Sequence, residues 1–383
     1  MINKGTNNIQ RLFIFFNIFL SIFWHFSNGI AEGYEERKIS PDITEKEENH
    51  GTDEKPCMFT SLTEKAVLSG LIELNYEFSD IADPEDKHSG HATDFYVGSV
   101  ELALDLLLNK WIRTEFIVNA EDIGKDGEKV NIILDEAVVI LKCPNTPFYL
   151  IAGRTVLPFG VFEDHMISGT LTEDLYEIKD TGVTLGFTPD YYDFDISLTI
   201  YDGNNVIKNL EDFGAIELSE SRNEERKVNS FIFNISLEPL EDVLSVSTFY
   251  NNESGDGRRN QTLGGALTFN VREFTLDVEY IKALSREKGE DAEENLESAG
   301  LVGLSFKPSE KLELASRYEF FIDDYREDRD GILKSRYLAG FNYSFTDFAT
   351  FSFEYRHCDY EKERGSNAAD EENEFIFQLS LEF

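Results

Sequence analysis

The sequence is poor in basic residues: Lys and Arg number 35 against 74 Asp and Glu, which gives a formal net charge of -39. A charge of that sign argues against nucleic acid as a partner, because the phosphates would be repelled. Proline is also scarce, with 9 residues, whereas aromatic residues make up 13% of the chain. Disordered segments are poor in aromatic residues. Most of the 383 residues are therefore expected to fold, as one large or two ordinary domains.

Long apolar runs are missing too, except near the N-terminus. The run from Leu12 to Phe26 is short for a membrane span and is interrupted by polar residues. Basic residues precede it and small residues follow it, as in a cleaved export signal. We predict a signal peptide over residues 1–31, with an N-terminal membrane anchor as the alternative. Residues 32–65 are acidic and lack alternation, which predicts a periplasmic linker or short helix.

From residue 66 to the C-terminus, short segments alternate apolar and polar residues, the period of a β-strand with one apolar face. The chain ends on such a segment, "EFIFQLSLEF". Its apolar face holds Phe375, Phe377, Leu379, Leu381 and Phe383. Another segment, "YVGSVELALDL", predicts Tyr96 and Val100 on one apolar face, with Glu101 opposite.

About sixteen such segments occur, a number consistent with an outer-membrane barrel. Their connections alternate between short turns and long loops rich in Asp, Glu, Gly and Asn, as in an up-and-down barrel with periplasmic turns and external loops. A soluble β-sandwich also alternates, but polar faces this charged would suit a wet lumen and not a packed interior. We therefore predict an all-β transmembrane antiparallel barrel over residues 66–383, located in the bacterial outer membrane.

The third external connection, between a strand ending at Arg154 and one beginning near Thr181, is unlike the others because it is partly apolar ("VLPFGVF"). We predict that it folds into the barrel and narrows a pore; a loop that only caps the barrel is the alternative. The predicted constriction residues are Phe159, Phe162, Glu163, Asp164, His165, Glu173, Asp174 and Glu177.

Arginines are expected on the inward strand faces opposite this loop. Acids on the loop and bases on the wall would create a transverse field that orients polar solutes. Each arginine could instead pair with a neighbouring acid and serve rigidity only. The predicted lumen-facing bases are Arg113, Arg154, Arg317, Arg336 and Arg356.

Few motifs suggest other chemistry. His165 beside Asp164, or His357, could belong to a catalytic pair at the outer rim, and His88 and His91 could ligate a metal. These signals are weak, no nucleophile motif or phosphate loop accompanies them, and we predict no enzyme activity, no cofactor and no metal site.

Cysteine is limited to Cys57, Cys143 and Cys358, and no CxxC pair occurs. In the predicted topology Cys143 and Cys358 lie at opposite rims, too far apart for a disulfide. Cys57 and Cys143 would both be periplasmic, so that pairing is left open.

Four stretches carry a resemblance to a known family: "AGRTVLPFGVFEDHMISGTLTEDLYEIKDTGVTLGF", "GGALTFNVREFTLDVEYIKAL", "LELASRYEFFIDD" and "FATFSFEYRHCDYE". From about Leu68 to Phe383 the chain resembles the LbtU family of siderophore porins. It departs from the family pattern at Thr170, where proline is preferred, and over 204–227, which is longer and more charged. The resemblance implies an outer-membrane barrel that takes up a ferric siderophore without a plug domain.

The resulting hypothesis is a porin-like channel for passive or facilitated uptake of a small polar solute, with a ferric siderophore as the solute that the resemblance implies. A general or cation-preferring porin is the alternative, and a structural or adhesive surface barrel is another. Expected partners are outer-membrane lipid and lipopolysaccharide, and the barrel-assembly machinery through Phe383. The oligomeric state is left open, with a homotrimer as one outcome.

Overall fold

The structure is a computed structural model, and it describes residues 65–82, 90–127, 130–143, 146–189, 194–216, 228–288, 296–323, 332–361 and 371–383. The predicted signal peptide, the predicted linker up to residue 64, Cys57 and His88 lie outside these residues. Among the described residues, no helix has the length and apolar character needed to cross a membrane.

The described chain contains sixteen strands and two short helices. Their bounds are β1 (Ala66–Ala82), β2 (Gly90–Asn109), β3 (Ile112–Ile123), β4 (Asn131–Lys142), β5 (Phe148–Val156), α2 (Leu171–Tyr176), β6 (Lys179–Phe187), β7 (Phe194–Asp202), α3 (Asn205–Asp212), β8 (Val228–Leu240), β9 (Leu244–Glu253), β10 (Asn260–Val271), β11 (Phe274–Ser285), β12 (Glu297–Ser309), β13 (Leu312–Asp323), β14 (Leu333–Thr346), β15 (Ala349–Tyr360) and β16 (Glu371–Glu382).

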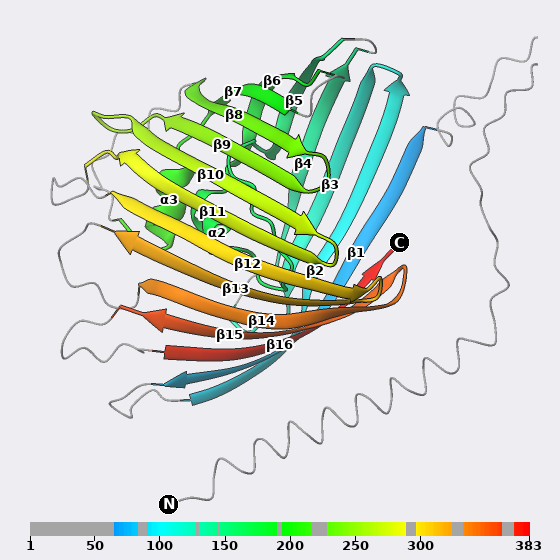
Figure 1. The fold of residues 1–383 in the computed structure, drawn as a ribbon, viewed down its shortest axis with the longest axis vertical. Coiled ribbons are helices and arrows are strands. Elements are labelled where there is room, and N and C mark those ends of the chain that lie inside the picture. The colour runs from blue at the N-terminus through cyan, green and yellow to red at the C-terminus, as the bar shows by residue number, and fades with distance from the viewer. Residues whose placement is uncertain are drawn as a thin grey trace, which may run out of the picture. The chain divides into compact units, whose positions relative to one another are not determined.

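The strands form one closed antiparallel barrel in which each strand pairs with its neighbours in the sequence (Figure 1). The last strand closes the barrel on the first, with Asn75 opposite Gln378. Backbone hydrogen bonds join Gly70 and Phe383 in both directions, at 3.0 and 3.1 Å. Closure gives backbone donors and acceptors partners that lipid cannot supply. The predicted sixteen-strand up-and-down barrel is confirmed.

Alternation separates the two faces of the wall. In β13 the side chains of Arg317 and Glu319 are buried inside, whereas Tyr318 and Ile322 are 38% and 56% exposed on the outer face. On the closing strands, the outward Phe375 packs on Phe78 with ring centroids 6.0 Å apart. An outer face of aromatic and aliphatic side chains is what acyl chains require.

One face assignment was wrong. The register between β1 and β2 shifts next to Gly98, so that Ser99 lies opposite Glu73 and Tyr96 lies opposite Asn75. This β-bulge places Tyr96 on the inner face, where its hydroxyl donates to Glu77 at 3.1 Å. A single extra residue reverses the facing of all the residues before it.

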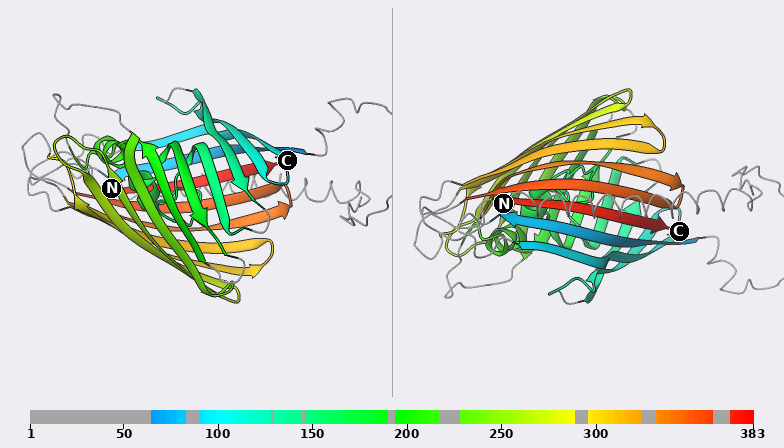
Figure 2. Two further views of the ribbon diagram at one scale, coloured as in Figure 1. Left: turned by 90° about the horizontal axis from the view of Figure 1, so that it is seen from above. Right: turned by 90° about the horizontal axis from the view of Figure 1, so that it is seen from below.

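The interior of the barrel is partly filled by the chain itself. The segment between β5 and β6, which includes α2, and helix α3 after β7 both lie inside the ring of strands (Figures 1 and 2). They share one apolar core with the walls of β7 to β15. This core comprises, among others, Leu157, Phe159, Leu171, Leu175, Ile178, Val206, Ile207, Leu210, Phe249, Ile281 and Phe321. Helix α3 falls within 204–227, the stretch that departs from the LbtU pattern in length and charge.

Candidate functional site

The segment from Leu157 to Ile178, called the inner segment below, starts and ends side by side, since the Leu157 amide donates to the Ile178 carbonyl at 2.8 Å. Within it, Thr170 is the N-cap of α2: its side chain accepts from the Glu173 amide at 3.0 Å, and the Glu173 carboxylate accepts from the Thr170 amide at 3.2 Å. This capping box explains how the helix begins with threonine at the position where the family pattern prefers proline.

Apolar side chains of the inner segment pack against the barrel wall. Phe159 is fully buried and meets Phe249 of β9 edge to face, with ring centroids 5.0 Å apart. Gly160 has a φ of +95°, and a Cβ there would lie 2.1 Å from the ring of Phe162. Glycine is therefore required at this turn for both backbone and space. Phe162 itself has a φ of +53°.

Polar contacts fix the same segment from the side of β11 to β15. The Val161 amide donates to Glu279 at 2.8 Å, and the Thr172 hydroxyl donates to the same carboxylate at 2.7 Å. His165 lies between two carboxylates, 3.0 Å from Asp277 and 2.8 Å from Glu313. Hydrogen bonds to these acids raise the pKa of His165 to about 9.

Three predicted arginines contact the inner segment directly. Arg317 pairs with Asp164 at 2.6 Å, Arg336 lies 3.5 Å from Asp174, and Arg356 donates to the Ser168 hydroxyl at 2.9 Å. Arg317 and Arg336 are only 5% and 6% exposed. Of the two roles predicted for them, a transverse field or pairing with a neighbouring acid, these contacts favour pairing: Arg317 Nε also lies 3.1 Å from Glu319, and Arg336 pairs with the same carboxylate. Carbonyls and carboxylates of a segment buried in a barrel need donors, and these guanidinium groups supply them.

The other two predicted arginines lie elsewhere. Arg113 pairs with Asp105 at 2.5 Å and Glu115 at 3.2 Å, next to the short turn between β2 and β3. Arg154 lies opposite Thr181 in the register of β5 and β6. Thr181 shares its strand face with Val183, which is 48% exposed on the outside of the barrel. The prediction that Arg154 faces the lumen was therefore wrong.

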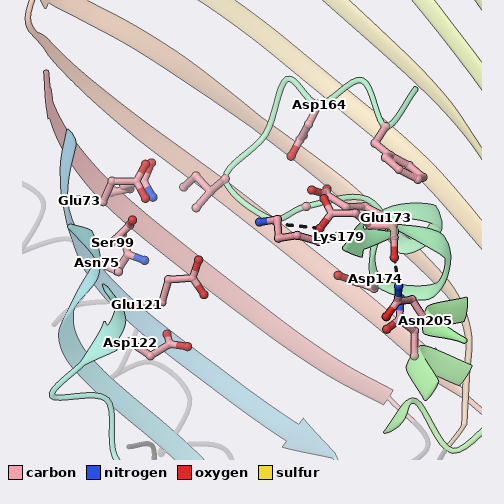
Figure 3. Close-up of a pocket in the computed structure, with 17 residues that line it drawn as sticks. Glu73, Asn75, Ser99, Glu121, Asp122, Asp164, Glu173, Asp174, Lys179 and Asn205 are labelled. Carbon is pink, nitrogen blue, oxygen red and sulfur yellow. Dashed lines mark hydrogen bonds and ion pairs between the residues drawn. The ribbon is translucent and has the colours of Figure 1, made fainter. Parts of the chain in front are cut away.

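A cavity of about 940 Å³ remains between the inner segment and the opposite wall, which is formed by β1, β2, β3 and β16 (Figure 3). In Figure 3, Glu73, Glu121 and Asp122 lie on the wall side, and Glu173 and Asp174 lie across from them. The lining residues are Glu73, Asn75, Gly98, Ser99, Glu121, Asp122, Phe162, Asp164, Ile167, Gly169, Glu173, Asp174, Glu177, Lys179, Asn205, Asn209 and Gln378.

The lining is strongly acidic, with seven carboxylates and a single base, Lys179. That base is already engaged, since its ammonium lies 2.8 Å from Asp135 and 4.0 Å from Glu177. Within the described part of the chain, neither Glu73 nor Glu121 has a basic partner. A narrow space lined by one sign of charge concentrates ions of the opposite sign.

Five predicted constriction residues line the cavity, and three do not: Phe159 is in the core, His165 bridges to the wall, and Glu163 is exposed outside the lining. The sequence missed the wall acids Glu73 and Glu121, which appeared only as the polar faces of ordinary strands. Burial also raises the pKa of Glu173 to about 7, with the neighbouring Glu177 and Asp164 adding to the effect.

Comparison with known proteins places the chain among porins. A family model described as "Putative beta-barrel porin-2, OmpL-like" matches residues 166–383, more than half of the chain. The chain belongs to this family. A search of curated proteins finds no match to this OmpL-like porin. The siderophore specificity implied by the LbtU resemblance is not confirmed by the family match and stays a prediction.

Solved structures similar to this OmpL-like porin share its fold. The anion-selective porin from Comamonas acidovorans aligns with a TM-score of 0.61 and 10% identity, covering 83% of this chain and 99% of the other. OmpF of Salmonella typhi in complex with daunomycin gives 0.60 and 13%, covering 83% and 97%. A trimer form of Vibrio cholerae OmpT gives 0.54 and 14%, covering 83% and 100%. The protein is thus a porin-like channel for small solutes in the bacterial outer membrane. Its family and fold are those of channels and not of enzymes.

Proposed function

We propose that this porin is a diffusion channel that prefers cations and neutral polar solutes over anions. The observation that carries the proposal is the lining of the cavity, where seven carboxylates face one lysine that is already paired. Asp122, Asp164 and Asp174 pair with bases outside the lining, which leaves Glu73, Glu121 and Glu173 as the acids without a basic partner among the described residues. The guanidinium groups of Arg317, Arg336 and Arg356, which could attract anions, donate instead to the inner segment. The fold of an anion-selective porin does not argue against this, because selectivity depends on side chains that 10% identity does not preserve.

The inner segment is proposed to be the constriction, because it lies between the acidic cavity and the wall of β11 to β15. It is the third long connection at one end of the barrel. Outer-membrane barrels have long external loops and short periplasmic turns, so this end is proposed to face the outside. Residues 1–31 and 32–65 keep their predicted roles as export signal and periplasmic linker.

Ferric siderophore uptake is the narrower proposal, and its support is the resemblance of the sequence to LbtU proteins. The acidic lining constrains which complex would pass. A polycarboxylate complex carries negative charge and would be repelled by Glu73, Glu121 and Glu173, whereas a neutral or cationic complex would not. Uptake of labelled iron complexes of both kinds in a deletion strain tests this. Equal uptake in deletion and parent strains would remove the siderophore from the proposal.

The test of the channel proposal is the reversal potential of the purified protein in a planar bilayer under a KCl gradient. We expect stepwise conductance and a potential of the sign set by K⁺ permeation. A potential of the opposite sign would refute the cation preference. Absence of conductance steps would favour the alternative of a structural or adhesive surface barrel.

A homotrimer is a further proposal, supported by the trimer form of a fold neighbour. The mass of the detergent-solubilised protein, measured by light scattering, decides between trimer and monomer. Contacts with lipopolysaccharide, and with the assembly machinery through Phe383, also remain proposals.

A further inference from the structure

The inner segment has backbone groups that no strand satisfies. Between Ile167 and Leu171 the chain crosses the barrel interior without pairing to any neighbouring strand. Backbone amides and carbonyls held away from water need hydrogen-bond partners. Side chains of β13, β14 and β15 supply them.

Glu354 of β15 takes three of the donors, whereas the Leu171 amide donates to Glu319 at 2.7 Å. The Glu354 carboxylate accepts from the Ile167 amide at 2.9 Å, from the Ser168 amide at 3.0 Å and from the Ser168 hydroxyl at 2.5 Å. Glu354 itself is fully buried. Hydrogen bonds from backbone amides to a buried carboxylate are charge-assisted and correspondingly strong.

Two arginines of the same wall take the carbonyls. Arg317 donates to the Ser168 carbonyl at 2.7 Å and to the Gly169 carbonyl at 2.9 Å. Arg336 donates to the Gly169 carbonyl at 2.7 Å. These contacts are made with the backbone, so they fix the path of the chain and not the identity of its side chains.

The opposite side of this stretch faces the cavity that is proposed above as the solute pathway, and the inference rests on that proposal. Ile167 and Gly169 both line the cavity, whereas Glu354 does not. Displacement of this stretch toward or away from the acidic wall would change the width of the cavity. We infer that Glu354 is a positioning residue that sets the size limit of the channel by holding the backbone at Ile167 and Ser168. This role is independent of the proposed cation preference, because Glu354 adds no charge to the cavity lining.

The variant Glu354→Gln tests the inference. At present Oε2 of Glu354 accepts from both amides and Oε1 accepts from the Ser168 hydroxyl. Glutamine keeps the size of the side chain but replaces one of these oxygens by an NH₂ group, so that either the two amides or the hydroxyl lose their acceptor. The matched control is Glu115→Gln, the same change on the inner face of β3, where the contacts are with Arg113 and not with the inner segment.

The readout is the swelling rate of proteoliposomes in neutral sugars of increasing size, together with KCl conductance in planar bilayers. Neutral sugars respond to width and not to charge. We expect Glu354→Gln to admit the largest sugars several-fold faster than the wild type and to raise conductance, with Glu115→Gln at the wild-type rate. A role confined to barrel stability would lower heat resistance in SDS gels without moving the size limit.

A second variant covers the case in which Glu354→Gln does not fold. Ser168→Ala removes the hydroxyl that donates to Glu354 and accepts from Arg356, and leaves every wall residue intact. It should shift the size limit in the same direction by a smaller factor. Folded Ser168→Ala with the size limit and conductance of the wild type would overturn the inference, as would the same result for folded Glu354→Gln.

Discussion

The double substitution Glu73→Gln and Glu121→Gln removes two charges from the wall side of the cavity and preserves side-chain size. A sphere with the cavity volume of about 940 Å³ has a radius of ~6 Å, and at that distance in water two unit charges interact by about 0.7 kcal/mol. With a Debye length of about 8 Å at physiological salt, screening leaves about 0.3 kcal/mol.

Each carboxylate thus attracts a cation and repels an anion by about 0.3 kcal/mol, which changes the permeability ratio of K⁺ to Cl⁻ about threefold. Removal of both should lower that ratio about tenfold. The assay is the reversal potential in a KCl gradient, repeated at higher ionic strength, where screening should shrink the difference between variant and wild type.

The control is Glu115→Gln, which removes a carboxylate from the inner face outside the cavity lining. Its permeability ratio should stay near that of the wild type. If the double variant kept the wild-type reversal potential at low salt, the cavity between the inner segment and β1 to β3 would not be the ion pathway.

Three further outcomes follow from the inner segment. Because the pKa of Glu173 is about 7, raising the pH from about 6 to about 8 should ionise it and increase cation preference, and Glu173→Gln should abolish that pH dependence. The pKa of His165 is raised to about 9. The stabilisation by its charged contacts is therefore fully present below about pH 6.5 and is lost as the pH rises through about 9. Current noise should therefore rise above about pH 9 in the wild type, whereas His165→Asn should be noisy throughout; a quiet variant contradicts this. Phe159→Ala should cost about 3–5 kcal/mol of packing and expose the segment to protease, unlike Phe162→Ala at a half-buried site.

The barrel could be predicted from the sequence because each face of a strand meets one constant environment, either lipid or the lumen. Lipid selects apolar residues on one side and a wet lumen tolerates charge on the other, so alternation alone counts the strands. Alternation fails where an extra residue interrupts it, and Gly98 is such a residue, which is why Tyr96 was assigned to the wrong face. Arg154 was misplaced for a related reason: charge alone suggested the lumen, while the register of β5 puts it outside.

The candidate site was predicted less completely, since it depends on contacts between elements far apart in the sequence. The partly apolar stretch around Phe159 marked the inner segment as unusual, and the acids Asp164, Glu173 and Asp174 do line the cavity. Nothing in the sequence around these acids indicated which strands would face them across the cavity. Glu73 and Glu121 become part of the site only because β1 and β3 happen to lie across the barrel from α2.

The wall formed by β13 to β15 and the wall formed by β1 to β3 consequently have different roles, although their sequences look alike. On β13 to β15, alternating arginines and glutamates are buried against the inner segment, where each charge is matched by a partner or by backbone. On β1 and β3, Glu73 and Glu121 have no basic partner among the described residues, whereas Asp122 lies 3.9 Å from Lys125. A solute in the proposed pathway would therefore experience chiefly the field of Glu73, Glu121 and Glu173, because Asp164 and Asp174 are paired with arginines. The ion preference of the proposed channel is set by the charges that are left unpaired at its narrowest place. The overall charge of -39 has little influence there, because distant charges are screened within about a nanometre.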